Sequence, residues 1–118
     1  MKHIQQIKNE LGIGKVETFH GPWYHLQPKE NSVNGTQIDL LIDRKDATIN
    51  LCEMKFSEAE FTIDNDYSKI LRKKVDVFKT VTKTRKNIFV TMISTFGIAP
   101  NIYSNDLVSN SLTIDCLF

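Results

Sequence analysis

The sequence predicts a single α/β domain in which a mixed β-sheet is flanked by helices. Two segments of alternating hydrophobicity, at 37–43 and 49–56, surround a polar turn and indicate a β-hairpin. An amphipathic helix at 67–81 and an almost continuous apolar strand at 87–95 come next. This order predicts a βαβ unit, in which the second hairpin strand and the 87–95 strand are parallel neighbours with a right-handed crossover.

The N-terminal segment predicts a short helix. Ile4, Ile7 and Leu11 share one face, and Gly12 supplies a C-cap. No residue among 1–3 is a typical N-cap, so the helix begins without a start signal. We therefore expect the chain to be an excerpt from a longer protein.

Weaker signals precede the hairpin and close the chain. Residues 15–26 have a weak strand pattern, interrupted by a glycine and a proline, and we expect Trp23 in the core or at a strand edge. Residues 96–110 are expected to form a loop around Gly97 and Pro100. A last, short strand is predicted at 112–117.

The hairpin turn predicts the register of its two strands. If Arg44 pairs with Thr48 around a loop of residues 45–47, Asp39 lies opposite Glu53. Directly opposed residues on one face of an antiparallel pair have Cβ atoms about 5 Å apart. The sequence therefore predicts two carboxylates side by side.

Strand alternation places further polar residues on the face of the two carboxylates. Lys55 lies two residues beyond Glu53, and Gln37 two residues before Asp39. Two adjacent carboxylates repel each other unless a cation or a shared proton intervenes, so this cluster predicts a divalent-metal site. The alternative is a surface salt-bridge cluster in which Lys55 neutralises Glu53 and Asp39 is solvated.

Asp39, a hairpin, and then Glu53, Met54 and Lys55 resemble the signature of the PD-(D/E)xK nuclease superfamily, with Ile38 at the position of its proline. Further segments resemble the nuclease-like domain at the C-terminus of certain bacterial AAA-type ATPases, and together they extend the resemblance to nearly the whole chain: GTQIDLLIDR, INLCEMKFS, the helix at 67–78, STFG at 94–97 and the terminal IDCLF.

The resemblance implies a restriction-endonuclease-like fold and an Mg²⁺-dependent endodeoxyribonuclease, with Mn²⁺ able to substitute. Asp39, Glu53 and the carbonyl of Met54 would hold the metal ion. Lys55 would orient the attacking water and stabilise the charge that builds on the phosphate. Gln37 is a minor catalytic candidate that could hold a water or a phosphate oxygen.

The superfamily often places another acidic residue on its first helix. Glu10 is the only carboxylate of the predicted N-terminal helix. We expect the usual acid to lie upstream of Met1 if Glu10 does not replace it.

Basic residues are concentrated in and after the long helix, although the whole chain has a net charge of only +1. Residues 67–86 contain eight lysines and arginines against Asp76 alone. Lys69, Arg72 and Lys73 lie on the polar side of the helix, where they would follow a nucleic-acid backbone. The alternative is an ordinary solvated helix face.

Two functions are therefore expected from the sequence. The first is a metal-dependent DNA nuclease domain attached to an ATPase. The second is a noncatalytic module that binds nucleic acid or docks a partner for the ATPase, because fold alone does not decide activity. The implied partners are DNA and the ATPase domain of the parent chain, with a homodimer left open.

The two cysteines and the absence of a targeting signal predict a cytoplasmic protein. Cys52 and Cys116 lie in apolar, strand-like segments with no paired spacing, so we expect reduced core residues. No apolar run approaches the roughly 18 residues that a membrane-spanning helix needs. No membrane partner is expected.

Overall fold

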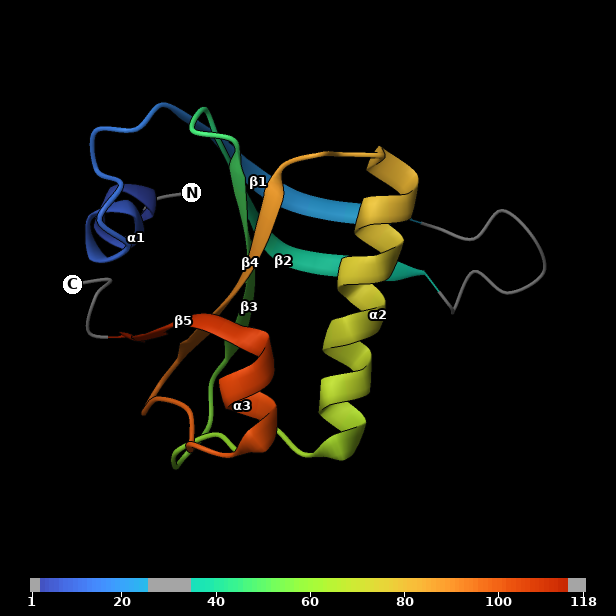
Figure 1. Cartoon of the computed structure of the whole chain (residues 1–118). Helices are drawn as coiled ribbons and strands as arrows, with labels where there is room; N and C mark the ends of the chain where they lie inside the picture. Colours follow the sequence, from blue (N-terminus) through green and yellow to red (C-terminus); the bar gives the residue numbers. More distant parts are fainter. Residues whose placement is uncertain (1–2, 26–34, 115–118) are drawn as a thin grey trace.

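The computed structural model describes residues 3–25 and 35–114. Five strands form one mixed sheet in the order β1-β2-β3-β4-β5, with α1 on one face and α2 and α3 on the other (Figure 1). This confirms the predicted α/β class. The elements are α1 (Ile4–Glu10), β1 (Thr18–His25), β2 (Thr36–Arg44), β3 (Thr48–Lys55), α2 (Asn65–Thr82), β4 (Asn87–Ser94), α3 (Ile102–Leu107) and β5 (Val108–Thr113).

The predicted hairpin is formed by β2 and β3, and its predicted register is confirmed. The antiparallel pairs run from Arg44–Thr48 at the turn to Leu40–Cys52. Ala47 closes the three-residue turn with a φ of 64°, in the left-handed region. The turn therefore fixes which side chains share a face further along both strands.

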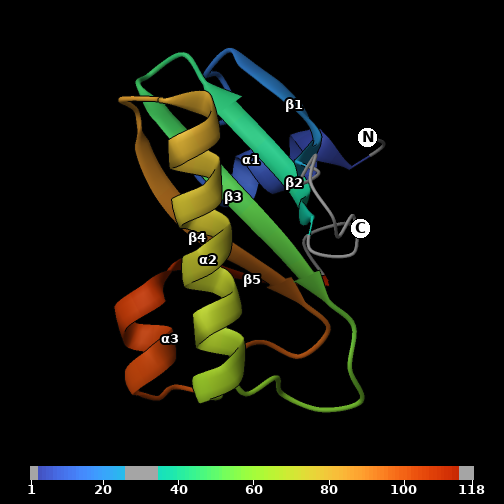
Figure 2. The ribbon, with the colours of Figure 1, turned by 90° about the vertical axis from the view of Figure 1, so that its right-hand side faces the viewer.

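The predicted βαβ unit is also confirmed. β3 and β4 are parallel, and their pairs extend to Lys55–Ser94 at the carboxyl ends of the strands. Between them, α2 begins after Asp64, whose Oδ1 accepts a hydrogen bond of 2.8 Å from the main-chain N–H of Tyr67. α2 lies along one face of the twisted sheet (Figure 2).

A β-bulge interrupts the pairing of β1 with β2. Gly21 pairs with Leu41 but Trp23 pairs with Ile38, so two residues of β2 lie opposite Pro22 alone. Proline has no N–H to donate, and a bulge is one of the few places where a strand tolerates it. The bulge is therefore explained by a residue of β1, whereas the extra residue lies in β2.

The two bulged residues are Asp39 and Leu40. Ile38 packs in the cluster that contains Phe78 of α2, whereas Leu40 packs in the cluster that contains Ile7 of α1. Strict alternation would place residues 38 and 40 on the same face. The bulge thus places Ile38 on the opposite face of the sheet from Leu40, and Asp39 lies between them where the alternation of faces is interrupted.

The C-terminal part of the chain differs from the sequence prediction. Residues 96–110, expected to be a loop, contain α3 and the start of β5. Asn101 and Ser104 cap α3 reciprocally through their side chains and main-chain N–H groups. β5 is parallel to β4 and begins earlier than the strand predicted at 112–117, of which residues 115–117 lie outside the described residues.

A chain of hydrogen-bonded polar side chains, two buried and one half-buried, crosses three strands. The Asn50 amide of β3 donates to Thr91 Oγ1 of β4 at 3.0 Å. Thr91 Oγ1 in turn donates to Asn110 Oδ1 of β5 at 3.5 Å. Asn50 and Thr91 are fully buried, so these bonds satisfy groups that water cannot reach.

The other expectations for the core are mixed. Trp23 packs edge-on against Phe78 with ring centroids 5.0 Å apart, which confirms its place in the core. Cys52 is a free, buried cysteine as predicted, and burial raises the pKa of its thiol to about 12. Ile70 and Val81 are at apolar positions of the amphipathic helix predicted at 67–81 and are therefore expected to be buried, but both are exposed.

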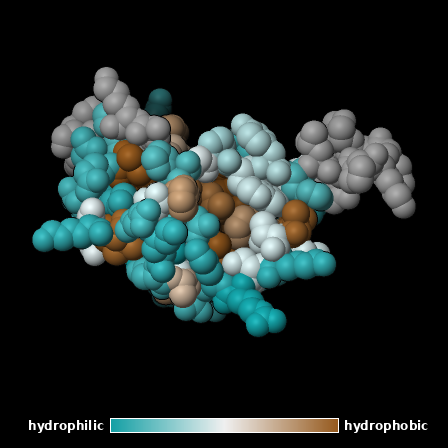
Figure 3. Space-filling model, turned by 90° about the horizontal axis from the view of Figure 1, so that it is seen from above, coloured by the Kyte–Doolittle hydropathy of each residue, from teal (hydrophilic) through white to brown (hydrophobic). Residues whose placement is uncertain are grey.

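Hydrophilic side chains cover most of the end of the molecule at the β2–β3 turn and the α2–β4 connection (Figure 3). Lys45, Asp46, Lys83 and Arg85 are exposed residues of these two segments. None of the helices in the described part of the chain combines the length and apolarity needed to cross a bilayer.

Candidate active site

Asp39 and Glu53 meet where the β2–β3 ladder opens. The main-chain N–H of Asp39 donates to Glu53 Oε2 at 3.1 Å, and the N–H of Met54 donates to Asp39 Oδ2 at 3.0 Å. Each carboxylate thus satisfies a main-chain group of the opposite strand. The structure confirms that the two acids are neighbours, and this arrangement holds both at fixed positions.

Lys55 is held by aromatic rings on the side of the sheet that faces α2. Its Nζ lies 4.8 Å from the ring centroid of Tyr67 and 5.8 Å from that of Phe61. Such contacts stabilise an ammonium group while leaving its N–H donors available. In the described part of the chain Lys55 has no ion pair, so its charge is not consumed by a carboxylate.

Lys74 of α2 neutralises Glu53. The two side chains form an ion pair in which Glu53 is 3% exposed and Lys74 is 20% exposed. The alternative in which Lys55 neutralises Glu53 is therefore wrong.

Sequence reasoning missed Lys74, although a signal was present. Lys74 follows Leu71 by three residues and precedes Phe78 by four, which is the spacing of the buried face of the helix. A lysine on that face needs a buried carboxylate partner, and Glu53 is that partner.

Two hydroxyl groups beside Lys55 have no hydrogen-bond partner among the described residues. They are Tyr67 Oη and Ser94 Oγ, and both atoms are buried. Ser94 is the partner of Lys55 in the parallel ladder, so the two share a face. Burial, with added repulsion from Glu53 and Asp39, raises the pKa of Tyr67 and keeps its hydroxyl protonated.

The described carboxylates would suit a hard divalent cation only if Glu53 gave up a present partner, because both of its oxygens already accept hydrogen bonds. In residues 3–25 and 35–114, no group of three or more His, Cys, Asp or Glu side chains is arranged to hold a metal ion. Mg²⁺ is commonly held by one or two carboxylates and several waters, and Asp39 and Glu53 offer that minimum. Asp39 is exposed, and its Oδ1 has no partner within the described ranges. Lys74 already takes one oxygen of Glu53 and would have to release it.

Met54 contacts the carboxylate pair through its main chain, whereas Glu10 is on a helix that covers the other face of the sheet. The main-chain N–H of Met54 donates to Asp39. The Met54 side chain packs against the cluster that contains Ile7 of α1, so only main-chain atoms of Met54 could bind a metal ion at the carboxylate pair. Glu10 lies on α1, which covers the opposite face of the sheet from α2 (Figure 1).

Gln37 lies beside the pair rather than in it. It lines a cavity of about 180 Å³ together with Lys73 and Lys74, between the start of β2 and α2. Within the described chain no hydrogen bond joins Gln37 to Asp39 or Glu53. Its predicted catalytic role stays a prediction.

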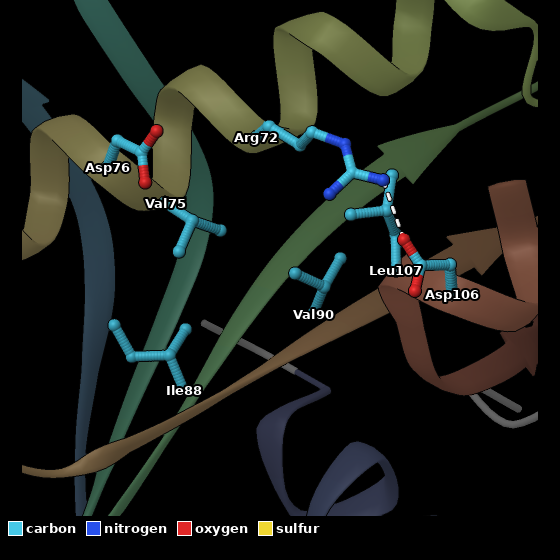
Figure 4. A pocket seen from close by; sticks show the side chains of 7 residues that line it. All are labelled: Arg72, Val75, Asp76, Ile88, Val90, Asp106 and Leu107. Carbon is cyan, nitrogen blue, oxygen red and sulfur yellow. Dashed lines mark hydrogen bonds and ion pairs between the residues drawn. The ribbon is translucent and has the colours of Figure 1, made fainter.

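The three basic residues expected to follow DNA do not share one environment. Arg72 forms an ion pair of 2.6 Å with Asp106 of α3, whereas Lys73 lines the cavity near β2 and Lys69 is exposed. The Arg72–Asp106 pair borders a separate cavity of about 270 Å³ between α2 and α3 (Figure 4). The remaining lining residues are Val75, Asp76, Ile88, Val90 and Leu107.

No protein-family model, no curated protein and no solved structure matches this chain. The relationship to PD-(D/E)xK nucleases therefore stays a prediction from the motif. The class that the structure does define is an α/β domain with a five-stranded mixed sheet flanked by helices.

Proposed function

We propose that this chain is a metal-dependent nuclease domain of the restriction-endonuclease-like fold, attached to an ATPase, and that it hydrolyses phosphodiester bonds in DNA. One observation carries the proposal. Asp39 and Glu53 are held together by main-chain hydrogen bonds, and Lys55, two residues after Glu53 on β3, contacts the Tyr67 ring and has no carboxylate partner among the described residues. Fixed acids beside a free ammonium are the groups that phosphodiester hydrolysis needs.

Each residue has a defined part in this reaction. Asp39, Glu53 and the Met54 carbonyl would hold Mg²⁺, which supplies an activated water and offsets charge on the scissile phosphate. Lys55 donates hydrogen bonds to the attacking water and to the phosphate oxygens as negative charge builds on them. The rings of Tyr67 and Phe61 keep the Lys55 ammonium in place.

The test separates metal binding from catalysis. Lys55→Ala should leave Mg²⁺ and DNA affinity nearly unchanged but slow cleavage about 100-fold or more, because its interaction is made mainly in the transition state. Asp39→Ala should lose both metal affinity and cleavage. Calorimetry with Mg²⁺ and cleavage assays on duplex, single-stranded and branched DNA supply the two readouts.

Lys79→Ala is the control for the lysine replacement, since Lys79 is an exposed lysine of α2 that is not one of the candidate site residues. It should behave as wild type in both assays. A wild-type chain that binds DNA but cuts none of the three substrates with Mg²⁺ or Mn²⁺ would refute the nuclease proposal.

DNA binding has its own signature. If Lys69, Arg72 and Lys73 contact phosphates, replacing all three with Gln should weaken binding and flatten the slope of log affinity against log salt by about 0.9 per lost contact. Arg72 already forms an ion pair with Asp106, so replacing Arg72 alone should lower DNA affinity less than replacing either of the two lysines alone. An unchanged slope would show that these residues do not contact phosphates and form an ordinary solvated helix face.

A noncatalytic module is the second candidate, and the Lys74–Glu53 pair favours it. An internal ammonium already neutralises the carboxylate that a metal ion would use. On this alternative the pair is permanent, and Mg²⁺ would not bind even when DNA is present. Calorimetry on the wild-type chain with DNA therefore decides between the two.

A further inference from the structure

Lys74 is shared between the carboxylate pair and a neighbouring cavity. Its Nζ binds Glu53 Oε1, and its side chain also lines the cavity of about 180 Å³ at the start of β2. Because one lysine belongs to both places, occupancy of one affects the other.

The chemistry of the cavity selects a negatively charged ligand. Its described lining residues are Gly35, Thr36, Gln37, Ile70, Lys73 and Lys74, and none of these six carries a carboxylate. Two ammonium groups, a hydroxyl and an amide can all donate hydrogen bonds to oxygen. At about 30 Å³ per water molecule the cavity has room for about six, which is enough for a tetrahedral anion with part of its hydration shell.

The position of the cavity relates this anion to the candidate reaction. Gln37 is two residues from Asp39 along β2, and Lys74 touches Glu53 directly. A ligand here is adjacent to the phosphate that the carboxylates and Lys55 would act on. A nucleic-acid strand carries a phosphate at each nucleotide, so a second phosphate is available on either side.

We propose that this cavity binds a phosphate of the substrate strand next to the one that is cut, and that Lys74 exchanges Glu53 for this phosphate. The inference rests on the proposed function. Before substrate arrives, Lys74 neutralises Glu53 and keeps the buried carboxylate compensated. When a divalent cation takes over Glu53, Lys74 loses its partner.

An ammonium that is only 20% exposed is unfavourable without a counter-charge, and the strand phosphate replaces the lost carboxylate. Metal and DNA binding are therefore positively coupled, and the coupling is equal in both directions. Lys74 thus makes the metal site complete only when a strand is present.

The test measures Mg²⁺ affinity by calorimetry with and without a saturating short single-stranded DNA. The Lys55→Ala chain is used to prevent cleavage, and products are checked at the end of each titration. DNA should tighten Mg²⁺ binding at least about fivefold, within the usual range of coupling between sites. Equal Mg²⁺ affinity with and without DNA would overturn the inference.

Variants assign the coupling to this cavity. Lys74→Gln keeps an amide donor for Glu53 and should abolish the coupling. Lys73→Gln changes an exposed residue and should weaken DNA binding with no effect on Mg²⁺ affinity in the absence of DNA. Lys79→Gln does not touch the cavity and should preserve the coupling. Equal losses in Lys79→Gln and Lys74→Gln would overturn the assignment, and Lys73→Gln still tests the cavity if Lys74→Gln does not fold.

Two further arms separate the remaining explanations. Inorganic phosphate replaces DNA in one titration, and coupling at a concentration no higher than that of DNA phosphate would overturn the assignment to a strand. Cleavage by the wild-type chain is scored separately. Coupling without cleavage refutes the proposed catalysis and supports the phosphate site, whereas cleavage without coupling refutes the phosphate site alone.

Discussion

The two ends of the β2–β3 hairpin both carry charged residues, but among the described residues only the open end lies beside buried hydroxyl groups that have no hydrogen-bond partner. At the turn, Arg44 bonds to Asp46 and Asn50, and Lys86 bonds to Asp43 and to the carbonyl of Arg44. These groups complete one another. Charges at the turn therefore belong to the structure of the hairpin.

At the open end, side chains of the neighbouring elements α2 and β4 are left with incomplete hydrogen bonding. Tyr67 Oη and Ser94 Oγ have no partner in the part of the chain that the structure describes, and Lys55 faces aromatic rings instead of an acid. Native proteins seldom leave buried polar groups unpaired without a reason. The comparison teaches that unsatisfied groups, more than charge itself, distinguish a candidate site from a structural cluster.

The largest expected effect comes from breaking the buried pair at the open end. Lys74→Met should lower the free energy of unfolding by about 3–5 kcal/mol, because it leaves the Glu53 carboxylate buried without a counter-charge. Urea unfolding measures the loss. Adding Glu53→Gln to this variant should recover much of it, since the uncompensated charge is gone.

Lys86→Met is the matched change at the turn. Lys86 and Asp43 are 35% and 41% exposed, and water screens their interaction. The expected loss is about 1 kcal/mol or less. Equal losses for Lys74→Met and Lys86→Met would contradict the distinction between the two ends.

Tyr67→Phe sharpens the comparison in the opposite direction. Removing a buried hydroxyl that has no partner should leave the free energy of unfolding unchanged or raise it by about 1 kcal/mol. Tyr24→Phe, at an exposed tyrosine, should change nothing and serves as the control. A loss of more than about 1 kcal/mol in Tyr67→Phe would show that the hydroxyl is already bonded.

The smallest effect concerns acid titration at the turn. The hydrogen bond from Arg44, with smaller help from nearby charge, holds the pKa of Asp46 below its ordinary value of 3.8. A lowered pKa contributes stability above the unfolded value, and that stability disappears as pH falls through the folded value. Carboxyl-carbon NMR should find a midpoint below 3.8 that returns towards it in Arg44→Met. A wild-type midpoint at or above 3.8 would contradict the closed turn.

Much of the fold could be predicted because local patterns determine it. The three-residue turn fixes the hairpin register and places Asp39 near Glu53. The alternation of β3 puts Glu53 and Lys55 on one face, and the apolar run of β4 identifies a strand that is buried on both faces over residues 90–94, although Phe89 is exposed. Each of these inferences needs only a few consecutive residues.

The missed features depend on shorter or more distant signals. α3 has six residues, too few for a helical period to emerge against its loop-like flanks. The bulge at Asp39 reflects Pro22, which lies opposite β2 only after β1 docks on that strand. The Lys74–Glu53 ion pair joins α2 to β3, so predicting it requires knowledge of how the helix is rotated on the sheet.

The polar chain through Asn50, Thr91 and Asn110 also favours one register of β4 between β3 and β5. If β4 slid by one residue, Val90 or Met92 would replace Thr91, and the Asn50 amide would be buried without an acceptor at a cost of about 1–3 kcal/mol. Parallel strands joined by a long crossover are otherwise free to misalign, because no tight turn sets their register. A chain in which β4 is mispaired thus loses free energy at Asn50, separately from the contacts that Glu53 and Lys55 make with α2.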